Sequence, residues 1–328
     1  MVAKIIRNSQ VCLRDRYKKS DCLQCHLACP QGCINENLDF DLSNCNQCGL
    51  CLSVCPAEAI AGEEYSSKSY SDLLESTQSP VYLSCTRQDK RGNWPCLGFL
   101  DARLLLALVY SGKNGNRQVI IDNHACLNCN PKVADYLSNL FTALNSILAF
   151  AEKELLVMGP NGYKNKEKVI SRRDLAKFLL GQTIMVIADA IEYDGTPEPV
   201  TRQKFFSDYV GPSSLAKIAP TELFHGIAIA ENCRACGLCE KICPRHAIKI
   251  ETNESVLDFY HYAFRCTGCG VCAANCPEDA LTIVHVNNLD KMHIKARILP
   301  SCKECGRFYQ PIESSEICIE CYLKQNSF

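Results

Sequence analysis

The sequence predicts an α+β protein in which two cysteine-rich modules flank a small βαβ unit and a group of helices. Three observations lead to this prediction: cysteine runs that recur with one spacing, a strand–helix–strand pattern between them, and two C-x2-C pairs near the C-terminus. We expect the successive parts of the chain at residues 1–64, 65–132, 133–225, 226–290 and 291–328.

One cysteine run is written twice in residues 226–290. The pattern C-x2-C-x2-C-x3-C-P occurs at Cys233, Cys236, Cys239 and Cys243, and again at Cys266, Cys269, Cys272 and Cys276. This spacing resembles the bacterial dicluster ferredoxins, where three cysteines of one run and the fourth of the other hold each 4Fe–4S cluster. A pair of zinc sites is the alternative, although zinc prefers paired C-x2-C knuckles. The resemblance implies one cluster on Cys233, Cys236, Cys239 and Cys276, and another on Cys243, Cys266, Cys269 and Cys272.

Residues 1–64 carry the same pattern with one ligand displaced. The complete run is Cys45, Cys48, Cys51 and Cys55, whereas the partner run keeps only Cys22, Cys25 and Cys29. Its first ligand would fall on Lys19, which cannot bind iron, so Cys12 is expected to fill the position, with Cys33 as the competitor. The module resembles ferredoxin-like subunits with a modified first motif. That resemblance implies one cluster on Cys12, Cys22, Cys25 and Cys55, and another on Cys29, Cys45, Cys48 and Cys51.

The central segment predicts a βαβ unit. Apolar strands are expected at 81–83 and 119–121, with a helix from about Cys96 to Tyr110 between them. Because parallel strands end at one edge of a sheet, the following cysteines should converge there, and Cys96 at a helix start should have a lowered pKa. The cysteines expected at this edge are Cys85, Cys96, Cys126 and Cys129.

This central unit resembles thioredoxin-like 2Fe–2S ferredoxins and the iron–sulfur subunits of hydrogenase–heterodisulfide reductase complexes. The resemblance implies one further iron–sulfur cluster, either 2Fe–2S or 4Fe–4S, while a zinc site and unligated structural or redox thiols stay open as alternatives. Helical periodicity continues at 133–156, and a second helix is expected at 174–190. No Gly-rich dinucleotide fingerprint follows any strand.

The C-terminal cysteines form two C-x2-C knuckles twelve residues apart, resembling a zinc ribbon. Four-cysteine zinc sites are closed and structural, and can supply the folding energy of a segment too short to own a core. A rubredoxin-like iron site is the alternative, but its second knuckle normally carries a Pro and a Gly that are missing here. The expected zinc ligands are Cys302, Cys305, Cys318 and Cys321.

Composition excludes several other classes of protein. The chain has 328 residues and 25 cysteines grouped at metal-ligand spacing, whereas disulfide scaffolds are short and secreted. The net charge of −1 without a basic block argues against nucleic acid, and no apolar run approaches the roughly 20 residues of a transmembrane helix. We expect a cytoplasmic protein of anaerobic metabolism, because a reducing compartment preserves free thiols.

We therefore interpret the chain as an electron-transfer subunit that passes single electrons along several clusters in an anaerobic oxidoreductase complex. It has no nucleophile or acid–base constellation, so it is not expected to be catalytic alone. The alternatives are a catalytic reductase centred on the central four cysteines, and an assembly scaffold with structural clusters. The expected partners are a separate catalytic chain, such as a hydrogenase, a formate or aldehyde oxidoreductase or a heterodisulfide-reductase-like flavoprotein, and a soluble ferredoxin.

Overall fold

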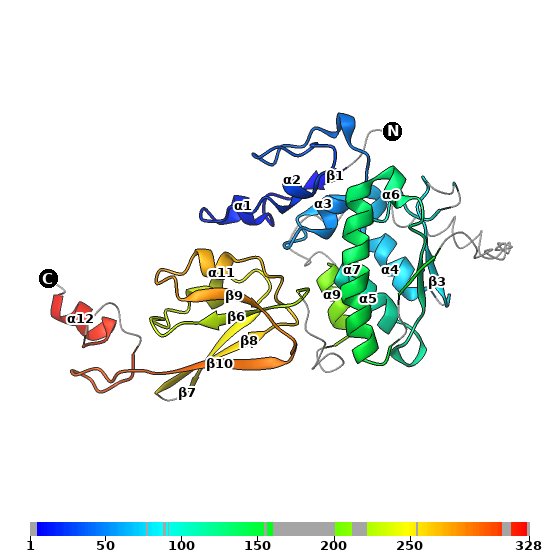
Figure 1. Ribbon diagram of the computed structural model, residues 1–328. Coiled ribbons are helices and arrows are strands. Elements are labelled where there is room, and N and C mark those ends of the chain that lie inside the picture. The colour runs from blue at the N-terminus through cyan, green and yellow to red at the C-terminus, as the bar shows by residue number, and fades with distance from the viewer. Residues whose placement is uncertain are drawn as a thin grey trace, which may run out of the picture.

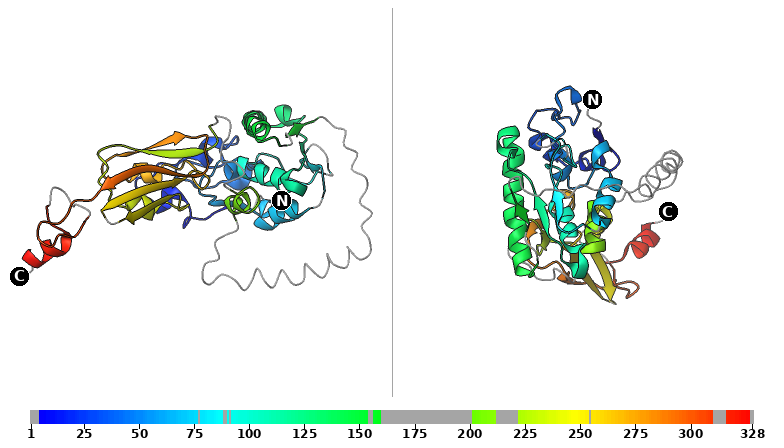
Figure 2. Two further views of the ribbon diagram at one scale, coloured as in Figure 1. Left: turned by 90° about the horizontal axis from the view of Figure 1, so that it is seen from below. Right: turned by 90° about the vertical axis from the view of Figure 1, so that its right-hand side faces the viewer.

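The structure is a computed structural model of the chain, and it contains both helices and sheets as predicted (Figure 1). We call residues 5–65 the first module, 66–159 with 201–211 the central unit, 222–298 the second module, and 299–326 the tail. The first module and the central unit lie together, the second module follows, and the tail projects from the end remote from β3 (Figures 1 and 2). The described residues are 5–76, 78–87, 90, 92–153, 156–159, 201–211, 222–253, 255–309 and 316–326.

The first module is closed by a short antiparallel strand pair. β1 (Ile5–Arg7) pairs with β2 (Ile60–Gly62), which joins the two ends of the cysteine-rich segment. The helices between and just after them are single turns, because the closely spaced cysteines bend the backbone repeatedly. They are α1 (Leu13–Arg16), α2 (Gln24–Ala28), η1 (Leu42–Asn44), α3 (Leu50–Ser53) and η2 (Glu63–Tyr65).

The central unit is built on a parallel sheet of order β3-β4-β5. β3 (Val81–Leu83) and β4 (Val119–Ile121) lie where the sequence predicted two strands, and they pair in parallel. β5 (Val157–Met158) was not predicted, since two residues are too few to show an alternating pattern. The remaining elements are α4 (Ser67–Glu75), α5 (Ala102–Tyr110), η3 (Lys113–Gly115), α6 (Cys126–Cys129), α7 (Pro131–Phe150) and α9 (Arg202–Tyr209).

The predicted bounds of the central helices were wrong at several ends. The helix expected from Cys96 begins only at Ala102, because Asp101 caps it by accepting a hydrogen bond from the Leu104 amide at 2.9 Å. The helix expected at 133–156 begins at Pro131 and stops at Phe150. The helix expected at 174–190 lies outside the described residues.

The second module contains two antiparallel sheets. One pairs β6 with β9, and the other has the order β10-β8-β7, so the strand at 291–298 belongs to this module's sheet. Phe259 and Leu281 are buried in the core that these sheets share. The elements are β6 (His225–Ile229), α10 (Leu238–Ile242), β7 (Ile248–Asn253), β8 (Val256–Tyr262), α11 (Val271–Ala274), β9 (Leu281–His285) and β10 (Lys291–Ile298).

The tail contains one helix and an isolated bridge. Ser301 and Phe308 form an antiparallel bridge, and α12 (Ile319–Asn326) lies at the far end of the molecule (Figure 2). Within the described part of the chain, no helix has both the length and the apolar character needed to cross a membrane.

The two cysteine modules touch through a small apolar contact. Leu13 of α1 and Val271 of α11 are both buried and belong to one hydrophobic cluster. The Tyr17 hydroxyl donates to the carbonyl oxygen of Ile242 at 2.9 Å across the same contact. The contact therefore fixes the cysteine loops of the two modules against each other.

A buried ion-pair network reinforces this contact. Glu58 of the first module pairs with Arg245 of the second at 2.9 Å and with Arg202 of α9 at 3.5 Å. Asp101 pairs with Arg202 at 3.2 Å, and Arg103 donates to the carbonyl oxygen of Cys266 at 2.9 Å. The central unit thus clamps both modules.

Candidate metal centres

The structure gathers seventeen of the cysteines around four cavities, with four cysteines at three of them and five at the other. Each cavity receives three cysteines close in sequence and a fourth from the other run of the same module, except that Cys12 joins Cys22 and Cys25. Cavity A contains Cys29, Cys45, Cys48 and Cys51, with Cys33 as an additional lining cysteine; cavity B contains Cys12, Cys22, Cys25 and Cys55; cavity C contains Cys243, Cys266, Cys269 and Cys272; and cavity D contains Cys233, Cys236, Cys239 and Cys276.

Cys12, the residue expected at the displaced position of the first module, lines cavity B with Cys22, Cys25 and Cys55. Cys12 precedes α1 and its amide donates to the Asn8 carbonyl oxygen at 3.0 Å, which turns the chain back toward cavity B. Cys33 instead lines cavity A, and its amide donates to the Cys29 sulfur at 3.2 Å. The two candidates for the displaced ligand therefore lie at different cavities.

The same backbone turn follows the last cysteine of every run. The amide four residues later donates to that cysteine's sulfur at 3.2–3.3 Å, and the residue three positions later has a positive φ. An N–H donor aimed at a sulfur stabilises negative charge on it, and such hydrogen bonds tune the potential of a cluster. The residues with positive φ are Gly32, Glu58, His246 and Asp279.

Because these cysteines are buried, their deprotonated thiolate form is unfavourable without a bound metal. Burial is the largest cause that raises the pKa of Cys48, Cys239 and Cys272 to about 12, and neighbouring cysteines raise it further. A coordinated metal reverses this effect, because it supplies the positive charge that stabilises the thiolate. The chemistry of the cavities therefore fits a cationic cluster core.

A buried histidine indicates that a group accepting a hydrogen bond would fit in cavity C. His261 of β8 lines the cavity, is fully buried, and neither ring nitrogen has a hydrogen-bond partner among the described residues. Burial lowers its pKa to about 4, so its ring is neutral and still carries one N–H donor. The sulfides and thiolates of a 4Fe–4S cluster are acceptors for such a donor, so the residues present fit this cofactor. Spacing alone did not single out His261, because only the folded β8 brings it to the cavity.

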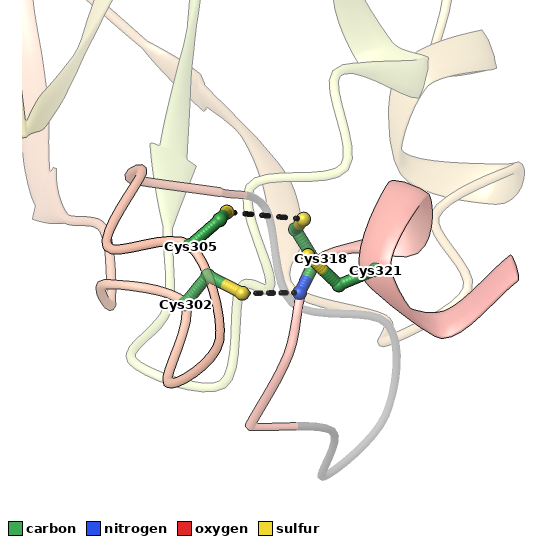
Figure 3. Close-up of side chains that lie close together, drawn as sticks. All are labelled: Cys302, Cys305, Cys318 and Cys321. Atoms are coloured by element: carbon green, nitrogen blue, oxygen red, sulfur yellow. Dashed lines mark hydrogen bonds between the residues drawn. The ribbon is translucent and has the colours of Figure 1, made fainter. Parts of the chain in front are cut away.

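The tail cysteines form a tighter group than those of the cavities. Cys302, Cys305, Cys318 and Cys321 lie with all four sulfurs within 4.8 Å of one another (Figure 3). The sulfurs of Cys305 and Cys318 are 3.8 Å apart, close to the separation of about 3.8 Å that tetrahedral Zn–S bonds of about 2.3 Å require.

Backbone hydrogen bonds prepare one of these sulfurs for a metal. Burial acts to raise the pKa of Cys302, but amides of Cys318, Cys305 and Glu304 oppose it and lower that pKa to about 6. The Cys318 amide donates to the Cys302 sulfur at 3.3 Å (Figure 3). A thiolate at neutral pH in this geometry suits zinc.

The central cysteines lie at the edge of the sheet, but one expectation about them was wrong. Cys96 is not at a helix start, since α5 begins six residues later. Burial raises its pKa, against the lowering effect of the Gly98 amide. The lowered pKa predicted for Cys96 is therefore contradicted.

Comparison with known proteins identifies iron–sulfur domains in both modules. Residues 232–280 match the 4Fe–4S dicluster domain, and residues 38–61 match the 4Fe–4S binding domain. The prediction of ferredoxin-type 4Fe–4S domains is thereby confirmed.

Two curated proteins are similar to short parts of the chain. Pyruvate synthase subunit PorD of Methanothermobacter marburgensis is 43% identical over 49 residues, which are 15% of this chain and 60% of that protein. The delta subunit of NADH-dependent phenylglyoxylate dehydrogenase of Aromatoleum evansii is 42% identical over 45 residues, 13% of this chain and 48% of that protein. The chain thus spans about half the length of these relatives.

Proposed function

We propose that the chain is an electron-transfer subunit carrying four 4Fe–4S clusters, one in each of cavities A to D. The observation that carries the proposal is that each cavity is lined by four cysteines in the expected combination, three from one run and one from the other in cavities A, C and D, and with Cys12 completing cavity B. Cys33 is an additional cysteine at cavity A. The relatives named above are subunits of pyruvate synthase and of phenylglyoxylate dehydrogenase, which supports a place beside a separate catalytic chain.

The electrostatic influence of cysteines in one cavity on those in the next supports a row in the order A–B–C–D. After burial, Cys25 of cavity B is among the groups that raise the pKa of Cys51 of cavity A, and Cys239 of cavity D is among those that raise the pKa of Cys272 of cavity C. This influence supports placing cavity A beside B and cavity C beside D.

The junction between the modules lies at cavities B and C. Cys22 of cavity B and Cys269 of cavity C pack against the same small hydrophobic cluster, and Cys269 is among the groups that raise the pKa of Cys22 after burial. The modules would then act as one electron path rather than as two separate ferredoxins.

The protein's own residues have three roles in this function. A bound 4Fe–4S cluster takes up or releases one electron. The cysteines hold the clusters, the apolar residues around them exclude water, and backbone amides and His261 donate hydrogen bonds that tune each potential. In this proposal, electron transfer requires no side chain to transfer a proton.

We further propose that the tail binds one zinc ion. The spacing of the four tail sulfurs supports zinc, because all four can reach the same ion.

We also propose that the chain works in a complex of anaerobic metabolism. The partners would be a catalytic oxidoreductase chain and a soluble ferredoxin, since a row of one-electron centres needs a donor at one end and an acceptor at the other.

Metal analysis of the anaerobically purified chain tests the proposal. Four clusters predict at least about sixteen iron atoms, an equal amount of acid-labile sulfide, and about one zinc per chain. Cys305→Ser should lose the zinc and keep the iron. An iron content near eight per chain would mean that one module does not hold two clusters.

A further inference from the structure

Four cysteines outside the cavities meet at one edge of the central sheet. The parallel strands β3 and β4 end together, with the Asp122 amide donating to the Leu83 carbonyl oxygen at 2.9 Å. Cys85 follows β3, while Cys126 and Cys129 bound α6 after β4. The topology therefore brings three of the four cysteines to the same edge.

Cys96 is brought to this edge by a separate loop. Trp94 forms a parallel bridge with Cys85, and the Thr86 amide donates to the Trp94 carbonyl oxygen at 2.7 Å. Cys96 lies two residues beyond Trp94 and is 5% exposed, like Cys126. Gly98, two residues beyond Cys96, packs against the start of α7: a side-chain carbon placed on it would lie 3.2 Å from a methyl carbon of Val133, four residues after Cys129.

Two buried N–H donors without a partner belong to residues that adjoin this set. Within the described part of the chain, Trp94 Nε1 and Asn130 Nδ2 have no hydrogen-bond acceptor. Trp94 pairs with Cys85, and Asn130 directly follows Cys129. A buried donor without a partner is destabilising, so an acceptor group is expected nearby. The sulfides of an iron–sulfur cluster are such acceptors.

The spacing of the sulfurs argues against zinc at this edge. In the part of the chain that the structure describes, the tail is the one place where several cysteine sulfurs all lie within 4.8 Å of one another. A zinc tetrahedron needs that compactness, whereas a cluster binds its thiolates to different iron atoms and spreads them further. Among the described residues, the central cysteines, like those of cavities A to D, do not form so compact a group, as is expected of cluster ligands.

We propose that Cys85, Cys96, Cys126 and Cys129 bind a fifth iron–sulfur cluster, which extends the row beyond cavity A. The binding of this fifth cluster does not depend on the order A–B–C–D proposed above, whereas its place at the end of that row rests on the proposed electron-transfer function. One electron would pass between it and the cluster of cavity A, so that one is oxidised as the other is reduced.

The contact with cavity A is direct. A side-chain carbon placed on Gly98 would lie 2.4 Å from the Cys48 carbonyl oxygen, so only glycine lets these backbones approach. The Tyr65 hydroxyl donates to the Gln47 carbonyl oxygen at 2.8 Å and lies 3.5 Å from that of Cys96. Because Cys129 is exposed, a redox partner could approach the fifth centre closely.

Cysteine replacement tests the fifth centre in the full chain. Cys96→Ser and Cys129→Ser should each lose about two to four iron atoms with equal sulfide, and one component of the electron paramagnetic resonance spectrum of the reduced protein. The signals of the other clusters should stay. Cys129 is exposed, so its replacement opens no core, and the exposed Leu127→Ser on the same helix is the matched control.

Other outcomes would overturn the assignment. Loss of zinc with unchanged iron would make the edge a zinc site. Unchanged iron, sulfide, zinc and spectra in both variants would leave four unligated thiols. A failure of the four-cluster proposal is distinct, because it would lower the iron content of the unmutated chain whatever these variants do.

Discussion

Replacing Glu58 by Gln should weaken the clamp between the two modules. The Glu58 carboxylate faces Arg245 at 2.9 Å and Arg202 at 3.5 Å, and it also accepts the Arg202 and Gln203 amides that begin α9, at 2.6 and 3.3 Å. Both arginine partners are largely buried, at 4% and 14% exposure. Removing one member of a buried ion pair costs roughly 3–5 kcal/mol.

The lower end of that range is expected, because Arg202 keeps its contact with Asp101 at 3.2 Å. With a urea dependence of about 3 kcal/mol per molar, a loss of about 3 kcal/mol lowers the unfolding midpoint by about 1 M. The assay is anaerobic urea unfolding followed by circular dichroism and by visible absorption of the clusters. Asp279→Asn is the matched control, since Asp279 has the same positive-φ position after Cys276 but is exposed. Equal midpoints for the two variants would refute the clamp.

Two further predictions concern the cavities. Cys12→Ala should lose or convert one cluster, because Cys12 lines cavity B with three other cysteines. Cys33→Ala should keep the full iron content, because Cys33 lines a cavity that has four cysteines without it. Iron analysis of both variants measures this, and the reverse result would exchange the roles of the two residues. His261→Phe should lower the reduction potential of the cluster in cavity C, since a lost hydrogen bond destabilises the more negative reduced state. A redox titration followed by electron paramagnetic resonance measures this, with Tyr260→Phe on the opposite face of β8 as control. Identical potentials in the two variants would separate His261 from the cluster.

The sequence by itself determined the local part of this protein. The expected cysteine sets depend on gaps of two and three residues, over which a short loop has few ways to place its sulfurs. The same is true of β3 and β4, where apolar runs and the crossover predicted a parallel pair that the structure contains. Cys12 could be named as a candidate because the vacancy at Lys19 was visible in the spacing.

Only the tertiary structure decided how these local pieces meet. Three features join residues far apart in the chain: the hydrophobic cluster against which both Cys22 and Cys269 pack, the clamp at Glu58, and the approach of His261 to cavity C. No sequence period encodes such contacts, since they depend on which faces of the folded modules are complementary. Cys96 illustrates the same limit: the helix-forming residues after Pro95 suggested a helix start, but the cap at Asp101 and the close approach of Gly98 to Cys48 keep this segment in a loop.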